Sequence, residues 1–170
     1  MLSQKVFATF DARPTGDPLA GIAISLLQEQ KSKWQLLADA YRSLDSVKVR
    51  EIHCDGFSTL LQFNPKRIVS TSANVDEKSV HERKCFLCPQ NLPDEQKGVL
   101  YREGFLVLCN PAPIFPYHFT ISTVQHTPQE IGKFVGTFLS LAKELSPEFT
   151  VFYNGPRCGA SAPDLSLIHI

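Results

Sequence analysis

Two closely spaced cysteines offer the clearest chemistry in the sequence. Cys85 and Cys88 stand in KCFLCPQN, and a two-residue spacer lets both thiolates face one point, as the ligands of a tetrahedral zinc ion do. His126 lies between a predicted strand and a predicted helix, and it is the best candidate for a third ligand. The spacing alone is also compatible with a redox pair or with two unrelated thiols beside a surface histidine.

A glycine-containing segment near the end of the chain could bind phosphate. Residues Asn154–Ser161 have the sequence NGPRCGAS and follow a predicted strand. Backbone N–H groups left open by glycine, together with a serine hydroxyl, are the donors that a phosphate needs. The segment matches neither a Walker A loop nor a dinucleotide-binding fingerprint, so a plain surface turn is the alternative. His118 lies within a predicted strand, where a histidine is more often a hydrogen-bonded core residue.

Strands outnumber helices among the elements that must position these residues. Hydrophobic spacing predicts helices over residues 17–44 and 127–145, and each begins with an N-cap residue followed by proline. The predicted strands cover residues 47–54, 57–63, 68–70, 99–101, 105–109, 117–124 and 149–153. Asp55-Gly56 is a two-residue hairpin turn. Short hairpin-like connections predict an α+β fold with an antiparallel sheet and flanking helices.

Composition narrows the class of protein. The chain has 170 residues, with 17 basic and 17 acidic side chains and 43% hydrophobic residues, which suits one domain or part of a larger one. Balanced charge argues against a sequence-independent nucleic-acid binder. No apolar run approaches the roughly 20 residues of a membrane span, and the first residues lack a signal-peptide core. We therefore expect a cytoplasmic protein with neither nucleic acid nor membrane as a partner.

Five motifs, taken together, resemble a known family. They are QFNPKRIVSTSANV, ERKCFLCPQNLPDEQ, LVLCNPAPIFPYHFTIS, QHTPQEI and FYNGPRCGASAPD. In their order and spacing they resemble the galactose-1-phosphate uridylyltransferase branch of the histidine-triad (HIT) superfamily. The nearest likeness is to a bacterial domain-of-unknown-function group similar to GDP-galactose phosphorylases. The resemblance extends over residues 20–164 and is weak before Gly21.

The resemblance implies a fold, a reaction and a metal. Such proteins have a HIT-like sheet and act on a nucleotide sugar or dinucleotide, transferring a nucleoside monophosphate through a covalent His–nucleotide intermediate. On the matching motifs, Cys85, Cys88 and His126 would bind a structural zinc ion.

The resemblance also assigns residues to the nucleotide. Asn154, Gly159 and Ser161 would hold the phosphates or orient the nucleophile. His118 would lie near the nucleotide, and Arg67 of the NPKR motif could pair with a phosphate. Donors placed around the phosphate would offset the charge that develops during transfer.

The sequence departs from the family after Asp164. The family continues with His-x-His-Phe-Gln, in which the first histidine completes the zinc site and the second is the nucleophile, whereas residues 165–170 are LSLIHI. The same six residues are encoded by a transposon end used in sequencing libraries, so we expect residues 165–170 to be a non-native tail. Residues 1–46 would then be an N-terminal helical segment packed on a partial nucleotidyltransferase domain, residues 47–164, that is incomplete at its C-terminus.

Two functions follow from these observations. The first is a fragment of a nucleotidyltransferase or phosphorylase that lacks its nucleophile and therefore does not turn over. The second is a non-catalytic, zinc-stabilised nucleotide-binding module. A thiol oxidoreductase is disfavoured, because it would place a cysteine at a helix start after a βαβ pattern and the polar segment before Cys85 offers neither. The chain could also form a homodimer.

Overall fold

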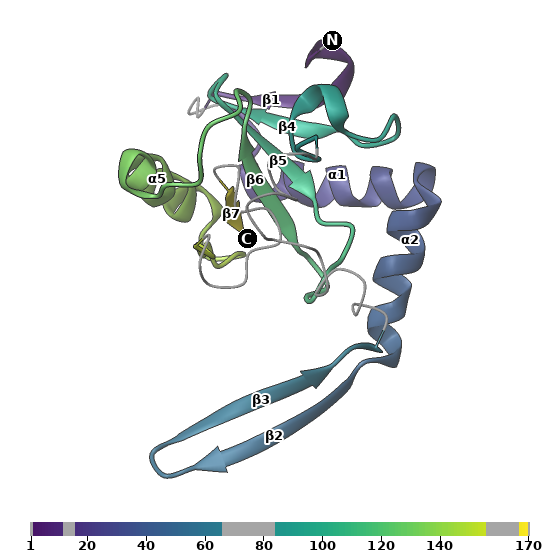
Figure 1. Ribbon diagram of the computed structural model, residues 1–170, viewed down its shortest axis with the longest axis vertical. Coiled ribbons are helices and arrows are strands. Elements are labelled where there is room, and N and C mark those ends of the chain that lie inside the picture. Colours follow the sequence, from purple (N-terminus) through teal and green to yellow (C-terminus); the bar gives the residue numbers. More distant parts are fainter. Residues whose placement is uncertain (1, 12–15, 66–83, 156–166, 170) are drawn as a thin grey trace.

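The chain folds into a mixed arrangement of helices and strands (Figure 1). The structure is a computed structural model, and it describes residues 2–11, 16–65, 84–155 and 167–169. The strands are β1 (Val6–Phe10), β2 (Lys48–Cys54), β3 (Phe57–Phe63), β4 (Gly98–Tyr101), β5 (Phe105–Cys109), β6 (Phe119–Thr123) and β7 (Leu167–His169). The helices are α1 (Leu19–Lys33), α2 (Gln35–Arg42) and α5 (Val135–Leu145), with 3-10 turns η1 (Leu2–Lys5), η2 (Ser43–Ser46), η4 (Pro89–Asn91) and η5 (Gly132–Phe134).

The main sheet is mixed. Within the described residues its strand order is β1-β4-β5-β6-β7, and the pairs β4–β5, β5–β6 and β6–β7 are antiparallel. β1 pairs with β4 in the parallel direction, which is possible because α1, α2 and the β2–β3 hairpin lie between them in the chain. The α+β prediction is confirmed. The segment 1–46 nevertheless contributes an edge strand to the sheet as well as helices.

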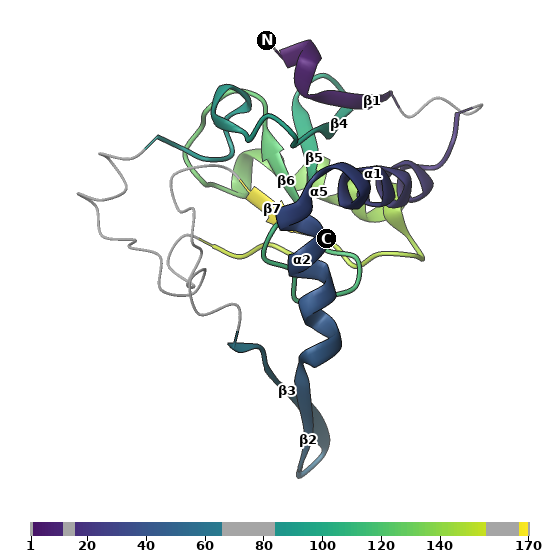
Figure 2. The same cartoon turned by 90° about the vertical axis from the view of Figure 1, so that its right-hand side faces the viewer.

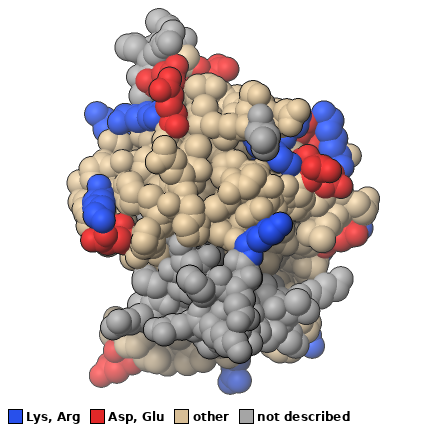
Figure 3. Space-filling view, turned by 45° about the horizontal axis from the view of Figure 1, so that its top comes forward, with Lys and Arg blue, Asp and Glu red and all other residues tan. Residues whose placement is uncertain are grey.

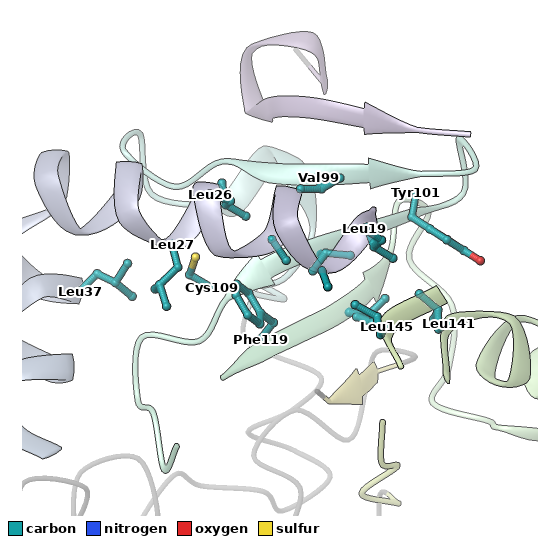
Figure 4. Packing of buried hydrophobic residues seen from close by; sticks show 14 of the residues in the cluster. Leu19, Leu26, Leu27, Leu37, Val99, Tyr101, Cys109, Phe119, Leu141 and Leu145 are labelled. Atoms are coloured by element: carbon teal, nitrogen blue, oxygen red, sulfur yellow. The ribbon is translucent and has the colours of Figure 1, made fainter. Parts of the chain in front are cut away.

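The helices bury one face of this sheet. Residues from α1, α2 and α5 pack with alternate residues of β4, β5 and β6 in one hydrophobic cluster (Figure 4). Leu19 and Leu26 of α1, Cys109 of β5, Phe119 of β6 and Leu141 of α5 are all fully buried. Burial of apolar area on this scale is the main term that stabilises a domain of this size.

The opposite face of the sheet carries a second, smaller cluster. Leu106 and Leu108 alternate along β5 with Val107 and Cys109, so they point away from the helices. They pack with Cys85, Leu87, Cys88 and Leu92 of the segment that leads into β4. The two predicted metal ligands in this segment therefore lie on the face that the helices leave open.

The predicted helix over residues 17–44 is interrupted. Trp34 has extended backbone angles (φ −120°, ψ 97°) and separates α1 from α2. Its side chain is buried, and the neighbouring turn is held by Gln30, whose amide contacts the Glu95 carbonyl and the Lys97 N–H at 2.9 and 3.0 Å. These are contacts over 65 and 67 residues, and no proline or glycine marks the break in the sequence.

Two further predicted elements differ from the structure. The helix predicted over 127–145 begins only at Val135, because Thr127 contacts Thr123 and Gln129 contacts Asn154 in place of capping a helix. The strand predicted over 149–153 is reduced to an isolated bridge at Phe152. The strand predicted over 68–70 lies outside the described residues.

The β2–β3 hairpin forms a separate sheet. Its strands pair antiparallel in full register from Lys48↔Phe63 to Cys54↔Phe57, with the predicted turn at Asp55-Gly56. Figures 1 and 2 show it extending from the end of α2, away from the main sheet. This hairpin is confirmed as a local structure, although its strands do not join the main sheet.

Charged side chains of both signs are interspersed on the surface. On the face drawn in Figure 3, Lys and Arg side chains lie beside Asp and Glu side chains. Two of the ion pairs are Lys133–Glu130 at 2.9 Å and Arg102–Glu144 at 2.6 Å. Among the described residues, no helix is both long and apolar enough to cross a membrane.

Candidate functional site

The structure brings the three predicted metal ligands together. The ligand atoms of Cys85, Cys88 and His126 all lie within 4.8 Å of one another, and Cys88 Sγ is 3.2 Å from His126 Nδ1. Both cysteines are buried, whereas the histidine is exposed. Residues 38 positions apart in the chain thus meet at one point because His126 follows the end of β6, beside the cysteine segment.

A tight turn aims the two cysteines. The Cys88 N–H donates to the Cys85 carbonyl at 3.3 Å, and the Asn91 N–H donates to the Cys88 carbonyl at 2.8 Å. The Asn91 side-chain amide also donates to the Cys85 carbonyl at 2.8 Å. These hydrogen bonds fix the backbone of the turn. The turn holds both thiol groups near His126.

This donor set fits a zinc ion. Tetrahedral zinc with Zn–S near 2.3 Å and Zn–N near 2.05 Å requires S–S and S–N separations of about 3.8 and about 3.6 Å. The Cys88 Sγ to His126 Nδ1 distance of 3.2 Å is close to the second value, and no two of the three ligand atoms are more than 4.8 Å apart. Two thiolates and an imidazole are the ligands that structural zinc prefers, and a fourth ligand would complete the tetrahedron.

A row of polar side chains lies on the same face of the sheet. In the β5–β6 register, Leu106 is opposite Ser122 and Leu108 is opposite Thr120, so Ser122 and Thr120 share the face of the cysteine segment. Both are buried, and within the described residues Ser122 Oγ has no hydrogen-bond partner. An unpaired buried hydroxyl costs about 1–3 kcal/mol. Buried unpaired groups are few in native proteins, and a bound water, ion or ligand is one way in which they are satisfied.

His118 continues this row just before β6. Its ring is buried, its Nδ1 accepts a hydrogen bond from the Ile114 N–H at 3.2 Å, and its Nε2 is 3.4 Å from the Asn110 side-chain amide. The ring therefore orders the loop between β5 and β6. Contact between His118 and a nucleotide remains a prediction.

Asn154 is joined to Gln129, in the segment that follows His126. The Gln129 amide nitrogen donates to the Asn154 carbonyl at 2.6 Å, while Gln129 Oε1 is buried and finds no hydrogen-bond partner in the part of the chain that the structure describes. The Asn154 side of the predicted phosphate-binding segment is thus tied to the chain that follows His126. Gly159, Ser161 and Arg67 lie outside the described residues, so their predicted roles remain predictions.

Sequence reasoning missed Ser122 and Gln129. The alternation of His118, Thr120 and Ser122 with apolar residues was a usable signal, because period-two polar residues in a strand share one face. Gln129 gave no such signal, because the hydrogen bond that orients its side chain is to the Asn154 carbonyl, 25 residues away.

The helix-covered face holds groups that do not belong to this site. Burial raises the pKa of the Cys109 thiol and of the Tyr41 phenol well above their ordinary values. Both groups therefore remain protonated at neutral pH. Cys109 points away from Cys85 and Cys88, so it is a buried structural thiol.

Comparison with known proteins identifies the family. Residues 26–169 match the model of a family described as a domain of unknown function (DUF4922), and the chain belongs to that family. The matched region contains Cys85, Cys88, His126 and Asn154. Comparisons with curated proteins and with solved structures gave no match.

Proposed function

We propose that this chain is a zinc-stabilised nucleotide-binding domain of the nucleotidyltransferase or phosphorylase type, acting on a nucleotide sugar or dinucleotide. The observation that carries the proposal is the convergence of Cys85, Cys88 and His126 beside a buried polar row on one face of the sheet. The resemblance of five motifs to the HIT superfamily supplies the class of ligand.

The metal would act on structure. Zinc held by Cys85, Cys88 and His126 would tie the cysteine segment to the end of β6, and its binding energy would add to folding stability. Among these residues only His126 is exposed, so the two thiolates would be shielded from solvent. The metal would thereby fix the position of the chain that runs from His126 to Gln129.

Gln129 and the polar row would contact the nucleotide. Gln129 Oε1 can only accept a hydrogen bond, so it would suit a ribose hydroxyl or a base N–H, whereas the Ser122 hydroxyl could donate to a phosphate oxygen. Each contact would remove the cost of a buried unpaired group. Asn154 would lie beside the same ligand through its contact with Gln129.

Transfer chemistry would need a nucleophile that this sequence lacks. In the family pattern, histidines stand at the positions of Leu165 and Leu167. A leucine neither ligates zinc nor attacks a phosphate, so we expect the 170-residue chain to bind nucleotide without turning it over. The alternative is a domain of this family that binds nucleotide and has no catalytic role.

Metal content tests the first part of the proposal. The purified chain should contain about one zinc ion per molecule, and cobalt substitution should produce the absorption bands of a thiolate-bound metal. Cys88→Ser should lose the metal. Cys54→Ser is the matched control, because Cys54 is an exposed free cysteine outside the cluster, and it should retain the metal. Equal zinc content in both variants would refute the site.

Nucleotide titration tests the second part. Calorimetry with UDP, GDP and ADP should show binding of at least one of them to the zinc-loaded chain. Gln129→Ala should weaken that binding about tenfold, the effect of losing one well-placed hydrogen bond. Gln35→Ala is the control, because Gln35 is exposed on α2 and contacts Asp39. Absence of binding by all three nucleotides would refute the nucleotide proposal and leave the zinc site standing.

A gain-of-function variant separates the two classes. Leu165→His with Leu167→His restores the family's His-x-His pattern in this sequence. If the chain is catalytic in type, the double variant should bind zinc more tightly. With a nucleotide sugar, the imidazole introduced at position 167 should attack the α-phosphate, break the bond to the bridging oxygen and release the sugar phosphate, leaving a covalent nucleoside monophosphate adduct detectable by mass spectrometry. Tighter zinc binding without an adduct would favour the non-catalytic module.

A further inference from the structure

The β2–β3 hairpin exposes an unusual amount of apolar surface. Every residue of both strands is exposed. The large apolar side chains and their exposed fractions are Val49 58%, Ile52 39%, Phe57 64%, Leu60 69%, Leu61 57% and Phe63 59%. A two-stranded hairpin by itself is marginally stable in water, and a contiguous apolar patch on a soluble protein marks an interaction site. The hairpin is therefore expected to be covered by a partner.

The two faces of the hairpin differ. One face is turned toward the segment between β5 and β6, because the Gln62 amide donates to the Ile114 carbonyl at 3.1 Å. On the same face, His53 Nδ1 lies 2.8 Å from Ser58 Oγ. We call the opposite one the outer face. From the register, its residues are Lys48, Arg50, Ile52, Cys54, Phe57, Thr59, Leu61 and Phe63.

Charge is arranged unevenly along the hairpin. Lys48 and Arg50 lie on the outer face in the two rungs nearest the base, and Asp55 belongs to the turn at the tip. Base and tip are about 20 Å apart, since each strand residue advances about 3.3 Å. Within the described part of the chain, these three side chains have no ion-pair partner. A hairpin with a cationic base and an anionic tip is complementary to a second copy lying in the opposite direction.

We propose that the outer face binds the outer face of a second copy of this chain, with the two hairpins stacked antiparallel about a two-fold axis. Asp55 of each copy then lies beside Lys48 of the other, with Arg50 one rung further along. The reverse orientation would place cationic bases against each other, which costs energy. A two-fold axis makes the two contact sets identical, as in most homodimers.

The stacking also matches the apolar residues. The rung of Lys48 and Phe63 lies over the rung of Cys54 and Phe57 of the other copy. The rung of Arg50 and Leu61 lies over that of Ile52 and Thr59, which would bury the apolar side chains of both copies. Each face is only about 23 Å long and two strands wide, so the interface is smaller than a standard one and the dissociation constant should be micromolar.

Sedimentation tests the association. The full chain, zinc-loaded, should change from monomer to dimer between about 1 and about 100 µM. Leu61→Ser, in the outer face, should raise the dissociation constant at least about tenfold. Leu139→Ser is the control, because Leu139 is equally exposed, at 62%, but lies on α5. A monomer throughout this range, or equal effects of both substitutions, would overturn the proposal.

Charge exchange tests the orientation without depending on how well any one variant folds. Asp55→Lys should abolish dimers, and so should Lys48→Glu combined with Arg50→Glu. Mixing the two variants should restore a dimer that contains one copy of each, because every contact then joins opposite charges. Dimers in the Asp55→Lys variant alone, or none in the mixture, would overturn the antiparallel arrangement.

Discussion

The β5–β6 pair and the β2–β3 pair are built alike and buried differently. Both are antiparallel and in continuous register, and β3 (FSTLLQF) has a larger share of apolar residues than β6 (FTIST). All five residues of β6 are buried, whereas all seven of β3 are exposed. Local sequence is thus sufficient to form a strand pair, while its burial depends on what the rest of the chain brings to it.

The two strand pairs also differ in what lies next to them. The buried pair carries the polar row of Thr120 and Ser122 on one face, next to the cysteine segment, and its other face is covered by helices. The exposed pair touches the body through the Gln62–Ile114 hydrogen bond. The functions proposed above place ligand binding in the first region and association between copies in the second.

The largest expected effect comes from truncating matched phenylalanines. Phe119 in β6 is fully buried and Phe57 in β3 is 64% exposed. Phe119→Ala should lower the free energy of unfolding by about 3–5 kcal/mol through lost burial and a cavity. Phe57→Ala should change it by less than about 1 kcal/mol at concentrations where the chain is monomeric. Urea unfolding measures both, and comparable losses would mean that the hairpin is part of the core.

A smaller effect is expected from adding one methyl group to either of two glycines. A Cβ at Gly98 in β4 would lie 2.8 Å from Leu108 Cδ2 and 3.0 Å from the Val107 carbonyl oxygen, whereas one at Gly136 in α5 would meet nothing within 4 Å. Gly98→Ala should therefore destabilise by about 1–3 kcal/mol. Gly136→Ala should stabilise by about 0.5–1 kcal/mol through helix propensity. Thermal unfolding of the two variants should shift in opposite directions.

Local signals predicted the elements that depend on neighbouring residues. The hairpin at Asp55-Gly56 and the strands around Val99 and Val107 follow from turn chemistry and apolar runs, and each is present. The break at Trp34 and the late start of α5 depend on contacts of Gln30 and Gln129 with distant residues. β1 was missed because a five-residue edge strand carries little pattern of its own.

The candidate site was predictable to a similar extent. The two-residue spacing of Cys85 and Cys88 is a local signal, and His126 was chosen because a strand end can aim an imidazole. The structure places all three together. The unpaired oxygens of Ser122 and Gln129 could not be predicted, because the sequence does not show which buried polar atoms find a hydrogen-bond partner among the described residues.

Removing one hydroxyl where the hairpin-bearing helix joins the body should have an intermediate effect. The Tyr41 hydroxyl in α2 donates to the His118 carbonyl at 2.8 Å, and the His118 N–H lies 3.3 Å from it. Tyr41→Phe should cost about 1–2 kcal/mol, because the His118 carbonyl keeps its bond from the Asn110 N–H while the His118 N–H loses a partner.

The same variant should alter the alkaline pH dependence. Burial raises the pKa of Tyr41 above its ordinary value, so the folded chain keeps the phenol neutral while the unfolded chain ionises it above pH about 10. Its contribution to stability is therefore complete below that pH and is lost as the pH rises further. Urea unfolding at pH about 8 and about 10.5 should show a smaller fall for Tyr41→Phe than for the unaltered chain. An equal or larger fall would assign the dependence to Tyr101 and Cys109, whose pKa values burial also raises.

The turn in the β2–β3 hairpin and the turn between β4 and β5 place different residue types at positive φ. In the hairpin, the residue with positive φ is Gly56, at 81°, which is the residue type that tolerates it best. Between β4 and β5 the residues are Arg102 and Glu103, at 46° and 59°, where side chains are strained. The main sheet can accommodate an unfavourable turn because β4 and β5 are held by packing. The stability of the exposed hairpin depends more strongly on its turn.

Substitutions at these turns should give the smallest effects, one on global stability and the other on the hairpin alone. Glu103→Gly should stabilise the chain by about 0.5–1 kcal/mol by relieving backbone strain, less what glycine adds to the freedom of the unfolded chain. Gly56→Ala should leave global unfolding unchanged and raise amide exchange within β2 and β3, because the strained turn loosens only the hairpin. Exchange measured residue by residue distinguishes the two. Loss of protection in β5 or β6 after Gly56→Ala would show that the hairpin and the main sheet unfold as one unit.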